Sequence, residues 1–334
     1  MSQTINQHDV STAALEIIYA PIKDELAEVE QILLRELQNE HPYVDELVRY
    51  GCMLGGKRLR PALLLLAAKA SGKLCQEHLV LAAVVELIHT ATLIHDDVLD
   101  EADQRRHLAT VNARWNNESS VLLGDYLFTH SFYLASTLDS TQACQIIGRA
   151  TNIVCEGELR QIGSRGNFEL DEEEYLDIIE AKTAELCACC CRLGAVYAAA
   201  DEEKTEQVAS FGRHLGIAFQ IADDLLDIQG DESSTGKSLG TDLEKQKPTL
   251  PLIRVLQLVE SDQRNELLGL LNNPEGFDRE SIAPWLEQFG ALSYAKERAA
   301  SFADRARQDI AELPDSPAKS VLAMLPEFVV MRTA

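Results

Sequence analysis

Two stretches of this chain carry the pattern Asp-Asp-x-x-Asp inside apolar sequence. The first is HTATLIHDDVLD at positions 89–100, and the second is QIADDLLD at positions 220–227. Residues four or seven apart share one face of an α-helix, so Asp96 and Asp100 point the same way and His89 joins them. Carboxylates crowded on one helix face repel each other unless a cation lies between them. Hard oxygen ligands suit Mg²⁺, so the pattern predicts a metal ion held between two acidic helices.

The second stretch repeats this alignment. Asp223 and Asp227 share a face, with Gln220 and Asp224 close beside them. One copy of the pattern fits a solvated helix end as well as a metal site. Two copies, each preceded by an apolar helix and followed by a basic loop, favour function. A calcium-binding EF-hand loop is a poorer interpretation, because its Gly-punctuated alternation is absent from the sequence.

Basic residues gather in two places. Lys57, Arg58 and Arg60 lie within the heptapeptide GGKRLRP. Arg105 and Arg106 follow the first acidic stretch. Glycines beside Lys and Arg can form a site where backbone N–H groups and cations hold phosphate, although a helix junction with solvated charges has the same composition. Together with the aspartates, these residues predict two anionic ligands, one held by metal and one by cations.

The totals narrow the class of protein. A net charge of −24 over 334 residues argues against nucleic acid or an anionic membrane as a bulk partner. We find no apolar run of the ~20 residues that would span a bilayer, and no secretory signal. The eight cysteines include three in a row at 189–191 and have no zinc-site spacing. Reduced thiols in a cytoplasmic protein are therefore expected.

Helical periodicity runs through almost the whole chain and predicts an all-α fold in one domain over residues 1–334. No alternating strand pattern is found. Predicted helices cover 11–19, 23–37, 44–54, 60–70, 76–99, 119–136, 141–162, 172–199, 204–228 and 249–259, with shorter helices after 279. The helix over 76–99 places its aspartates at the C-terminal end, where the helix dipole disfavours negative charge and a cation would compensate. Polar loops are expected at 101–107 and over the second cluster at 229–246.

The motifs GGKRLRP, HTATLIHDDVLD, RR, KTA, FQIADDLLD and GKSLGTDLEKQKPTLP, in this order, resemble those of the trans-type isoprenyl diphosphate synthases. The resemblance covers residues 54–252 and is strongest to bacterial long-chain enzymes of the octaprenyl diphosphate synthase kind, which make quinone side chains. It implies a helical bundle of the isoprenoid synthase type around a central cavity. It also implies a homodimeric prenyltransferase that adds isopentenyl diphosphate to an allylic diphosphate.

The resemblance further implies a role for each matched position. Up to three Mg²⁺ ions are assigned to the aspartates of both motifs: Asp96, Asp97, Asp100, Asp223, Asp224 and Asp227. Isopentenyl diphosphate is assigned to Lys57, Arg60, His89 and Arg106. The allylic diphosphate is assigned to Arg105, Lys182, Thr183, Gln220, Lys237 and Lys247. Of these, Lys182, Thr183 and Gln220 are expected to be catalytic, and the last two to offer oxygen dipoles to an allylic cation.

Two details qualify the resemblance. Family members commonly have Gly and then a basic residue after the Arg pair, whereas this chain has His107 and Leu108. That difference concerns the loop, and the metal chemistry is expected to survive it. His95 also precedes the aspartates, but it faces another side of the helix and is expected to be structural.

Product length in this family depends on the residues just before the first aspartate. Bulky side chains four or five positions earlier stop the growing chain, and here those positions hold the small residues Ala91 and Thr92. The helix over 119–136 either lines a deeper part of the tunnel or belongs to the ordinary core. The residues concerned are Gly124, Phe128, Ser131, Phe132 and Ala135. We therefore expect a long product of octaprenyl length, made from farnesyl diphosphate.

Three alternatives remain at this point. A non-catalytic partner subunit of the same fold should have eroded aspartate motifs, and both are intact. A terpene cyclase needs no isopentenyl diphosphate site, so the retained GGKRLRP and Arg pair argue against it. A metal-buffering helical protein explains the carboxylates and leaves the basic motifs without a purpose.

Overall fold

The structure is a computed structural model that describes residues 16–54, 56–230, 240–272 and 279–331. Helices make up nearly all of it, which confirms the all-α prediction. The helices in chain order are η1 (Ala20–Ile22), α2 (Lys23–Glu36), α3 (Pro42–Met53), α4 (Leu59–Ser71), α5 (Gln76–Leu99), α6 (Val111–Arg114), α7 (Asn117–Ser136), α8 (Gln142–Gly163), α9 (Glu172–Ile179), η2 (Glu180–Ala184), α10 (Glu185–Tyr197), α11 (Glu202–Gln229), α13 (Thr241–Glu244), α14 (Leu250–Leu258), α15 (Ser261–Leu271), α16 (Arg279–Gln288), α17 (Ala291–Asp309) and α18 (Pro317–Met331).

Side-chain caps mark the starts of some of the helices, among them α7 and α11. The side chain of Asn116 accepts a hydrogen bond from the backbone N–H of Ser119 at 2.7 Å, and Asp201 accepts one from Lys204 at 2.8 Å. Such caps satisfy backbone donors that the first helical turn leaves unpaired. As a result α7 and α11 each begin two residues before their predicted starts, at Asn117 and Glu202.

The long helix predicted over 172–199 is not continuous. The segment η2, Glu180–Ala184, is a π-helical turn between α9 and α10. A π-turn interrupts the regular backbone ladder and frequently marks a functional site. Apolar spacing continues on both sides of η2, so the sequence pattern did not reveal the break.

A short antiparallel hairpin begins within the loop predicted at 101–107, where the sequence has no alternating strand pattern. Strands β1 (Gln104–Arg105) and β2 (Leu108–Ala109) pair directly. The two residues between them, Arg106 and His107, have positive φ values of 53° and 63°. Glycine adopts this left-handed conformation most readily because it has no Cβ atom, and this chain instead places Arg106 and His107 there.

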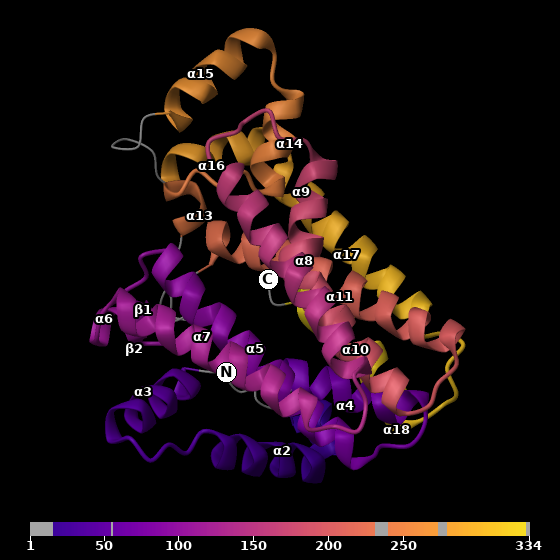
Figure 1. Cartoon of the computed structure of the whole chain (residues 1–334). Helices are drawn as coiled ribbons and strands as arrows, with labels where there is room; N and C mark the ends of the chain where they lie inside the picture. Colours follow the sequence, from indigo (N-terminus) through magenta and orange to yellow (C-terminus); the bar gives the residue numbers. More distant parts are fainter. Residues whose placement is uncertain (1–15, 55, 231–239, 273–278, 332–334) are drawn as a thin grey trace, which may run out of the picture.

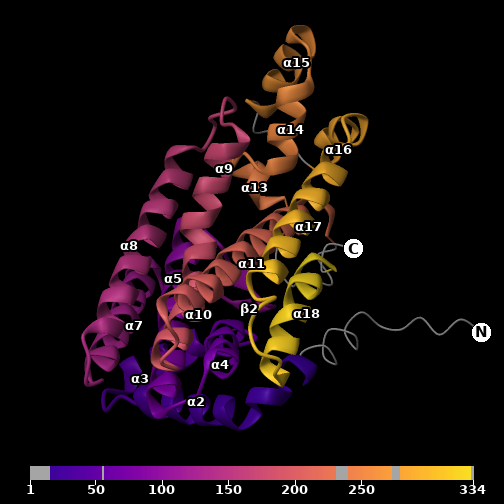
Figure 2. The ribbon, with the colours of Figure 1, turned by 90° about the vertical axis from the view of Figure 1, so that its right-hand side faces the viewer.

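The centre of the bundle is formed by α4, α5, α10 and α11. Helix α5 packs along α7 on one side and α4 on the other, while α10 joins α4 to α11 and α11 lies along α17. Figure 1 and Figure 2 show α2 and α3 at one end of the molecule and α15 at the other. A large apolar cluster runs through these central helices, and a smaller one lies around α14 and α16. That the chain is a single domain stays a prediction.

Small residues let the backbones of α10 and α11 approach closely. A Cβ atom on Gly212 would lie 2.6 Å from the carbonyl oxygen of Cys187, and one on Gly216 would lie 2.5 Å from Cα of Ala184. This contact brings η2 beside α11. Cys187 and the three consecutive cysteines after it are buried in α10 as free thiols, and burial raises the pKa of Cys189 to about 12.

Helix α5 is long and apolar enough, by length and composition alone, to cross a membrane. The prediction that the chain has no apolar stretch of this length was therefore wrong. Within its most apolar window, however, 72% is buried inside the protein. Its C-terminal end also carries the first acidic motif. The helix is apolar all round because other helices surround it.

Candidate active site

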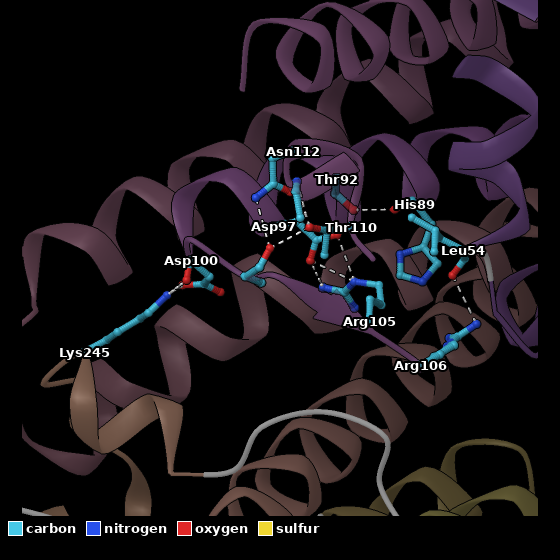
Figure 3. Close-up of polar contacts among 12 residues, drawn as sticks. Leu54, His89, Thr92, Asp97, Asp100, Arg105, Arg106, Thr110, Asn112 and Lys245 are labelled. Carbon is cyan, nitrogen blue, oxygen red and sulfur yellow. Dashed lines mark hydrogen bonds and ion pairs between the residues drawn. The ribbon is translucent and has the colours of Figure 1, made fainter. Parts of the chain in front are cut away.

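The three aspartates that end α5 have different neighbours. Asp97 is buried, and the guanidinium of Arg105 binds its Oδ1 through Nε at 2.9 Å and Nη2 at 2.8 Å (Figure 3). This bidentate ion pair attaches the hairpin to the end of α5. The structure therefore places Arg105 directly beside the acidic motif, while the contact predicted between Arg105 and an allylic diphosphate stays a prediction.

Asp96 lies among other charged groups. Its pKa is raised to about 6, chiefly by burial; Lys182 acts in the opposite direction, and the carboxylates of Glu158 and Asp100 contribute to the rise. Asp96 therefore lies among several carboxylates, with few cations nearby to neutralise their charge. A divalent cation would relieve this repulsion, as the spacing of the motif predicted.

Lys182 reaches this region from the π-turn. Its ammonium lies 2.5 Å from Oε2 of Glu158 and donates a hydrogen bond to Oε1 of Gln161 at 2.8 Å. Both partners belong to α8 and were missed in the sequence. In the sequence they are two polar residues three positions apart in GELRQ. The same spacing occurs on any exposed face of a helix, so it did not indicate a role for them.

Asp100 is surrounded by cations from distant parts of the chain. The ammonium groups of Lys245 and Lys247 both lie 3.2 Å from its Oδ1, and Nη2 of Arg165 lies at 3.5 Å. Lys245 also donates to the backbone carbonyl of Asp100 (Figure 3). Burial alone would raise the pKa of Asp100, but Lys247 and Lys245 hold it below its usual value. Of these cations only Lys247 was predicted.

In the second motif, Asp224 is buried and both of its oxygens are hydrogen-bonded. The hydroxyl of Tyr175 donates to Oδ2 at 2.7 Å, and the amide of Gln220 donates to Oδ1 at 2.8 Å. Burial and then the carboxylate of Asp242 raise the pKa of Asp224 to about 8, while the two hydrogen bonds act in the opposite direction. Asp223, by contrast, is only half-buried.

Asp227 and Lys247 connect the two motifs. Oδ2 of Asp227 accepts a hydrogen bond from the backbone N–H of Asp242 at 3.2 Å. The carboxylate of Asp242 lies 3.5 Å from the ammonium of Lys247, which also contacts Asp100. The end of α5 and the end of α11 are therefore joined through one lysine. Sequence spacing alone had not brought Asp242 into the site.

A separate basic cluster lies behind the acidic one. Nη1 of Arg60 is 2.8 Å from Nε2 of His89. Burial lowers the pKa of His89 well below its usual value, and four arginines, Arg60 and Arg105 foremost, lower it further. The imidazole is therefore neutral, accepts from Arg60 at Nε2 and carries its proton on Nδ1. The buried Nε of Arg60 has no hydrogen-bond partner among the described residues, which is the situation expected of an anion-binding arginine.

The glycine before Lys57 makes room for another member of this cluster. A Cβ atom on Gly56 would lie 2.7 Å from Nη2 of Arg106, and Nη1 of Arg106 donates to the carbonyl of Leu54 at 3.4 Å (Figure 3). Burial and the adjacent Arg105 lower the pKa of Arg106. Close packing of like charges is unfavourable without an anion, so the cluster fits a diphosphate ligand.

Arg58 anchors the loop before α4 through two ion pairs. Its φ is 54°, and its guanidinium lies 2.6 Å from Oε1 of Glu30 and 2.7 Å from Oε1 of Glu86. The hydroxyl of Tyr19 donates to the carbonyl of Lys57. Glu86 is 2% exposed and lies one helical turn before His89 on α5. These anchors hold the loop that carries Lys57 and leads to Arg60, the residue that contacts the histidine.

Thr183 and Gln220 face each other across η2 and α11. The hydroxyl of Thr183 donates to Oε1 of Gln220 at 2.7 Å. Lys237 lies outside the described residues. The other predicted diphosphate and metal residues come from the start of α4 and the loop before it, from α5 and the residues that follow it through the hairpin, from the π-turn, from α11, and from the segment between α13 and α14.

The residues predicted to set product length lie on α5 and α7. Ala91 is 1% exposed, Ala135 is fully buried, and the rings of Phe128 and Phe132 are 5.4 Å apart. The hydroxyl of Thr92 donates to the carbonyl of His89 at 2.8 Å. Their effect on the product stays a prediction.

His95, which was expected to be structural, extends from α5 and packs against α7. Its Nε2 lies 3.1 Å from the carbonyl oxygen of Val121, and its ring fills the space that a side chain on Gly124 would take.

A metal ion fits this site only with help from a ligand. Within the described ranges, no three acidic or histidine side chains lie close enough to hold a metal by themselves. Mg²⁺ is commonly bound by one or two carboxylates together with phosphate oxygens and water. The half-buried Asp96 and Asp223, with Asp100, offer such carboxylates. The donor set therefore fits a hard divalent ion that arrives with, or bridges to, a diphosphate.

An all-α bundle with paired acidic motifs beside a neutral histidine and a cluster of arginines defines a class of enzyme that joins diphosphate substrates. The sequence profile of the family described as polyprenyl synthetase matches residues 41–287. The chain belongs to this family and is a prenyltransferase, specifically a trans-polyprenyl diphosphate synthase.

Individual relatives agree with this assignment over nearly the whole chain. Octaprenyl diphosphate synthase of Escherichia coli K12 is 36% identical over 95% of this chain and 99% of its own length. The crystal structure of a decaprenyl diphosphate synthase from Rhodobacter capsulatus superposes with a TM-score of 0.90 at 36% identity, covering 96% of this chain and 99% of that one. A polyprenyl synthase from Caulobacter crescentus, complexed with calcium and isoprenyl diphosphate, gives a TM-score of 0.89 at 34% identity, covering 96% and 98%. Relatives of similar identity thus differ in product length.

Proposed function

We propose that this enzyme extends farnesyl diphosphate with isopentenyl diphosphate to octaprenyl diphosphate for a quinone side chain, with Mg²⁺ as its metal. Mg²⁺ at Asp96, Asp100 and Asp223 would neutralise the departing diphosphate when bound. Lys182 and Lys247 hold the same diphosphate, and its departure leaves an allylic cation. Oxygen atoms of Thr183 and Gln220 stabilise that cation.

The second substrate is held by the basic cluster. Arg60, Lys57 and Arg106 bind the diphosphate of isopentenyl diphosphate, and the Nδ1–H of His89 donates to it. Its double bond is thereby kept next to the cation, so that attack is effectively intramolecular. A proton then leaves the new chain, and the released diphosphate is the nearest base. No side-chain nucleophile takes part.

The neutral His89 beside Arg60 is the observation that supports this proposal most strongly. The imidazole is surrounded by arginines, and a buried guanidinium nitrogen of Arg60 lacks a protein partner in the described part of the chain. This arrangement provides an anion site away from the carboxylates. A terpene cyclase, which uses one diphosphate, has no use for it.

The proposal is tested by incubating the purified protein with farnesyl diphosphate, radiolabelled isopentenyl diphosphate and Mg²⁺. Products are dephosphorylated and sized by chromatography, with EDTA as the metal-free control. We expect octaprenol as the main product and no incorporation with EDTA. Incorporation into a different length would refute the octaprenyl assignment, and no incorporation at all would leave a non-catalytic partner subunit as the better reading.

We also propose that two copies form a cytoplasmic homodimer through α7 and α8. Leu122 on α7 is 61% exposed and Leu159 on α8 is 70% exposed. Helices α7 and α8 are joined by a short connection and contact each other. Exposed apolar patches of this kind mark interaction sites. Light scattering should give twice the monomer mass for the native protein and the monomer mass for the L122E/L159E double variant.

The free cysteines fit the proposed location. All eight are unpaired thiols in the structure, four of them buried in α10. Buried thiols of raised pKa are poor nucleophiles and need no disulfide-forming compartment.

A further inference from the structure

Tyr175 is a buried tyrosine of α9 that the proposed chemistry does not use. Its side chain is 3% exposed, and its hydroxyl donates to Oδ2 of Asp224 at 2.7 Å. A buried tyrosine hydroxyl needs a partner, but backbone carbonyls usually serve. Here the partner is the carboxyl group of a residue in the second acidic motif, so the hydrogen bond connects α9 to α11.

The other oxygen of Asp224 fixes the amide of Gln220. Its Oδ1 accepts a hydrogen bond from Nε2 of Gln220 at 2.8 Å. An amide that gives its NH₂ group to one side must present its oxygen to the other. Oε1 of Gln220 accordingly faces Thr183, whose hydroxyl donates to it at 2.7 Å. Four side chains from α9, η2 and α11 therefore form one continuous hydrogen-bonded row.

We propose that Tyr175 is a positioning residue for prenyl transfer, which acts through Asp224 to keep the amide oxygen of Gln220 turned toward Thr183 and the reacting carbon. The inference rests on the proposed function, because it requires an allylic cation near Thr183 and Gln220. An amide oxygen attracts such a cation, whereas an amide NH₂ group in its place repels it.

The hydroxyl of Tyr175 is what prevents this reversal. Without it, Oδ2 of Asp224 has no donor from α9, so the carboxylate can rotate and release the amide of Gln220. The released amide can turn its NH₂ group toward the reaction. Because the row does not include Asp96 or Asp100, this change should affect the chemical step more than the binding of either diphosphate.

The first experiment compares Tyr175→Phe with the native enzyme in steady-state kinetics with farnesyl and isopentenyl diphosphates. We expect kcat to fall about 10- to 100-fold, as for supporting residues of other sites, with both KM values and the half-saturating Mg²⁺ concentration unchanged. The matched control is Tyr43→Phe, which removes a 2.9 Å hydrogen bond to Ser119 and should keep native kcat. An unchanged kcat, or a higher Mg²⁺ requirement as the only effect, would overturn the proposal.

A double-mutant cycle tests the route through Gln220. If Tyr175 acts through that amide, then adding Tyr175→Phe to a Gln220→Ala enzyme should cause no further loss of kcat. Multiplying losses would mean that Tyr175 acts elsewhere. Rates are expressed per folded protein, measured by circular dichroism at the assay temperature. Should Tyr175→Phe fail to fold, Asp224→Asn serves instead, assayed at saturating Mg²⁺ because Asp224 is also assigned to the metal. Its amide can reverse Gln220 and should give the same loss of kcat; native kcat, or a loss that added Mg²⁺ restores, would refute the inference.

The two proposals fail differently. A native enzyme that forms no prenyl product contradicts the proposed function. An active native enzyme with an equally active Tyr175→Phe variant contradicts only the positioning role.

Discussion

The ammonium of Lys247 lies 3.2 Å from Oδ1 of Asp100, although 147 residues separate the two in sequence. Asp100 ends the first acidic motif, and Lys247 follows the second. A cation assigned to the diphosphate therefore contacts a carboxylate assigned to the metal. Binding of a metal diphosphate would exchange these partners, because metal would take the carboxylate and phosphate the lysine.

Replacing Lys247 with Met should weaken binding of the allylic substrate. One charge-assisted hydrogen bond contributes roughly 1.5–3 kcal/mol, so we expect KM for farnesyl diphosphate to rise about 10- to 100-fold. KM for isopentenyl diphosphate should stay the same. Lys73→Met, at an exposed position after α4, is the control. A rise confined to the KM for isopentenyl diphosphate would show that Lys247 belongs to the other substrate.

Replacing Arg60 with Lys should show the reverse selectivity. Lysine keeps the charge but loses the planar fork that contacts His89 and leaves a second nitrogen for phosphate. We expect KM for isopentenyl diphosphate to rise about tenfold, the loss of roughly one hydrogen bond, with KM for farnesyl diphosphate unchanged. The control is Arg35→Lys, an exposed arginine of α2 that pairs with its neighbour. Equal effects on both substrates would argue against separate anion sites.

The positions of the helices could be predicted because apolar spacing and caps are local signals. The helix over 76–99 was predicted with its observed ends. The π-turn at Glu180–Ala184 and the hairpin around His107 could not be, since a few residues of irregular backbone leave no periodic pattern. These two breaks are also where Lys182 and Arg105 enter the site.

The site itself could be predicted in part. The aspartates, Arg60 and His89 lie in long ordered motifs. Their supporting partners, such as Tyr175 and Glu86, are ordinary helix residues whose role depends on a contact with a distant element. Spacing along one helix does not reveal which side chain of another helix it meets.

Glu86 should matter for stability, because it is a buried carboxylate paired with Arg58. Glu86→Gln leaves the partly buried guanidinium without its full countercharge, and breaking buried pairs costs about 3–5 kcal/mol in general. We expect the free energy of unfolding, measured with urea, to fall by about 3 kcal/mol. Glu46→Gln, which breaks the exposed pair with Arg114, should change it by less than about 1 kcal/mol. Equal changes in the two variants would mean that the buried pair of Glu86 and Arg58 contributes no more to stability than the exposed pair.

His78 should make stability depend on pH. The ring is fully buried, with Nδ1 accepting from the backbone N–H of Cys75 at 3.0 Å and Nε2 donating to the carbonyl of Gly194 at 3.0 Å. Burial lowers its pKa from the usual 6.5, so the unfolded chain binds the proton more readily. The stability that His78 contributes is complete above about pH 6.5 and is lost as pH falls.

The measurement compares the native protein with His78→Asn by urea unfolding between about pH 7.5 and about pH 5.5. We expect the asparagine variant to be less stable at the upper pH and the difference to shrink toward the lower pH, by up to roughly 1.4 kcal/mol per pH unit. A difference that stays constant would mean that the ring does not titrate on unfolding.

Ala91→Phe should shorten the product. Ala91 is buried on α5 five residues before Asp96, on the path proposed for the growing chain, and phenylalanine would block that path close to the metal site. Ala135 lies on α7 and is proposed to line a deeper part of the same path, so Ala135→Phe should also shorten the product, but to a lesser extent. Either substitution overpacks the core at a cost of about 1–3 kcal/mol.

Lost stability lowers the amount of active enzyme without changing the ratio of products, so the quantity to measure is the distribution of prenol lengths by chromatography. We expect native, Ala135→Phe and Ala91→Phe enzymes to give successively shorter products. If both variants gave products of native length, neither α5 nor α7 would line the path of the growing chain. The reverse order would mean that Ala135, not Ala91, lies nearer the aspartates along that path, because a growing chain is stopped by the first obstacle that it meets.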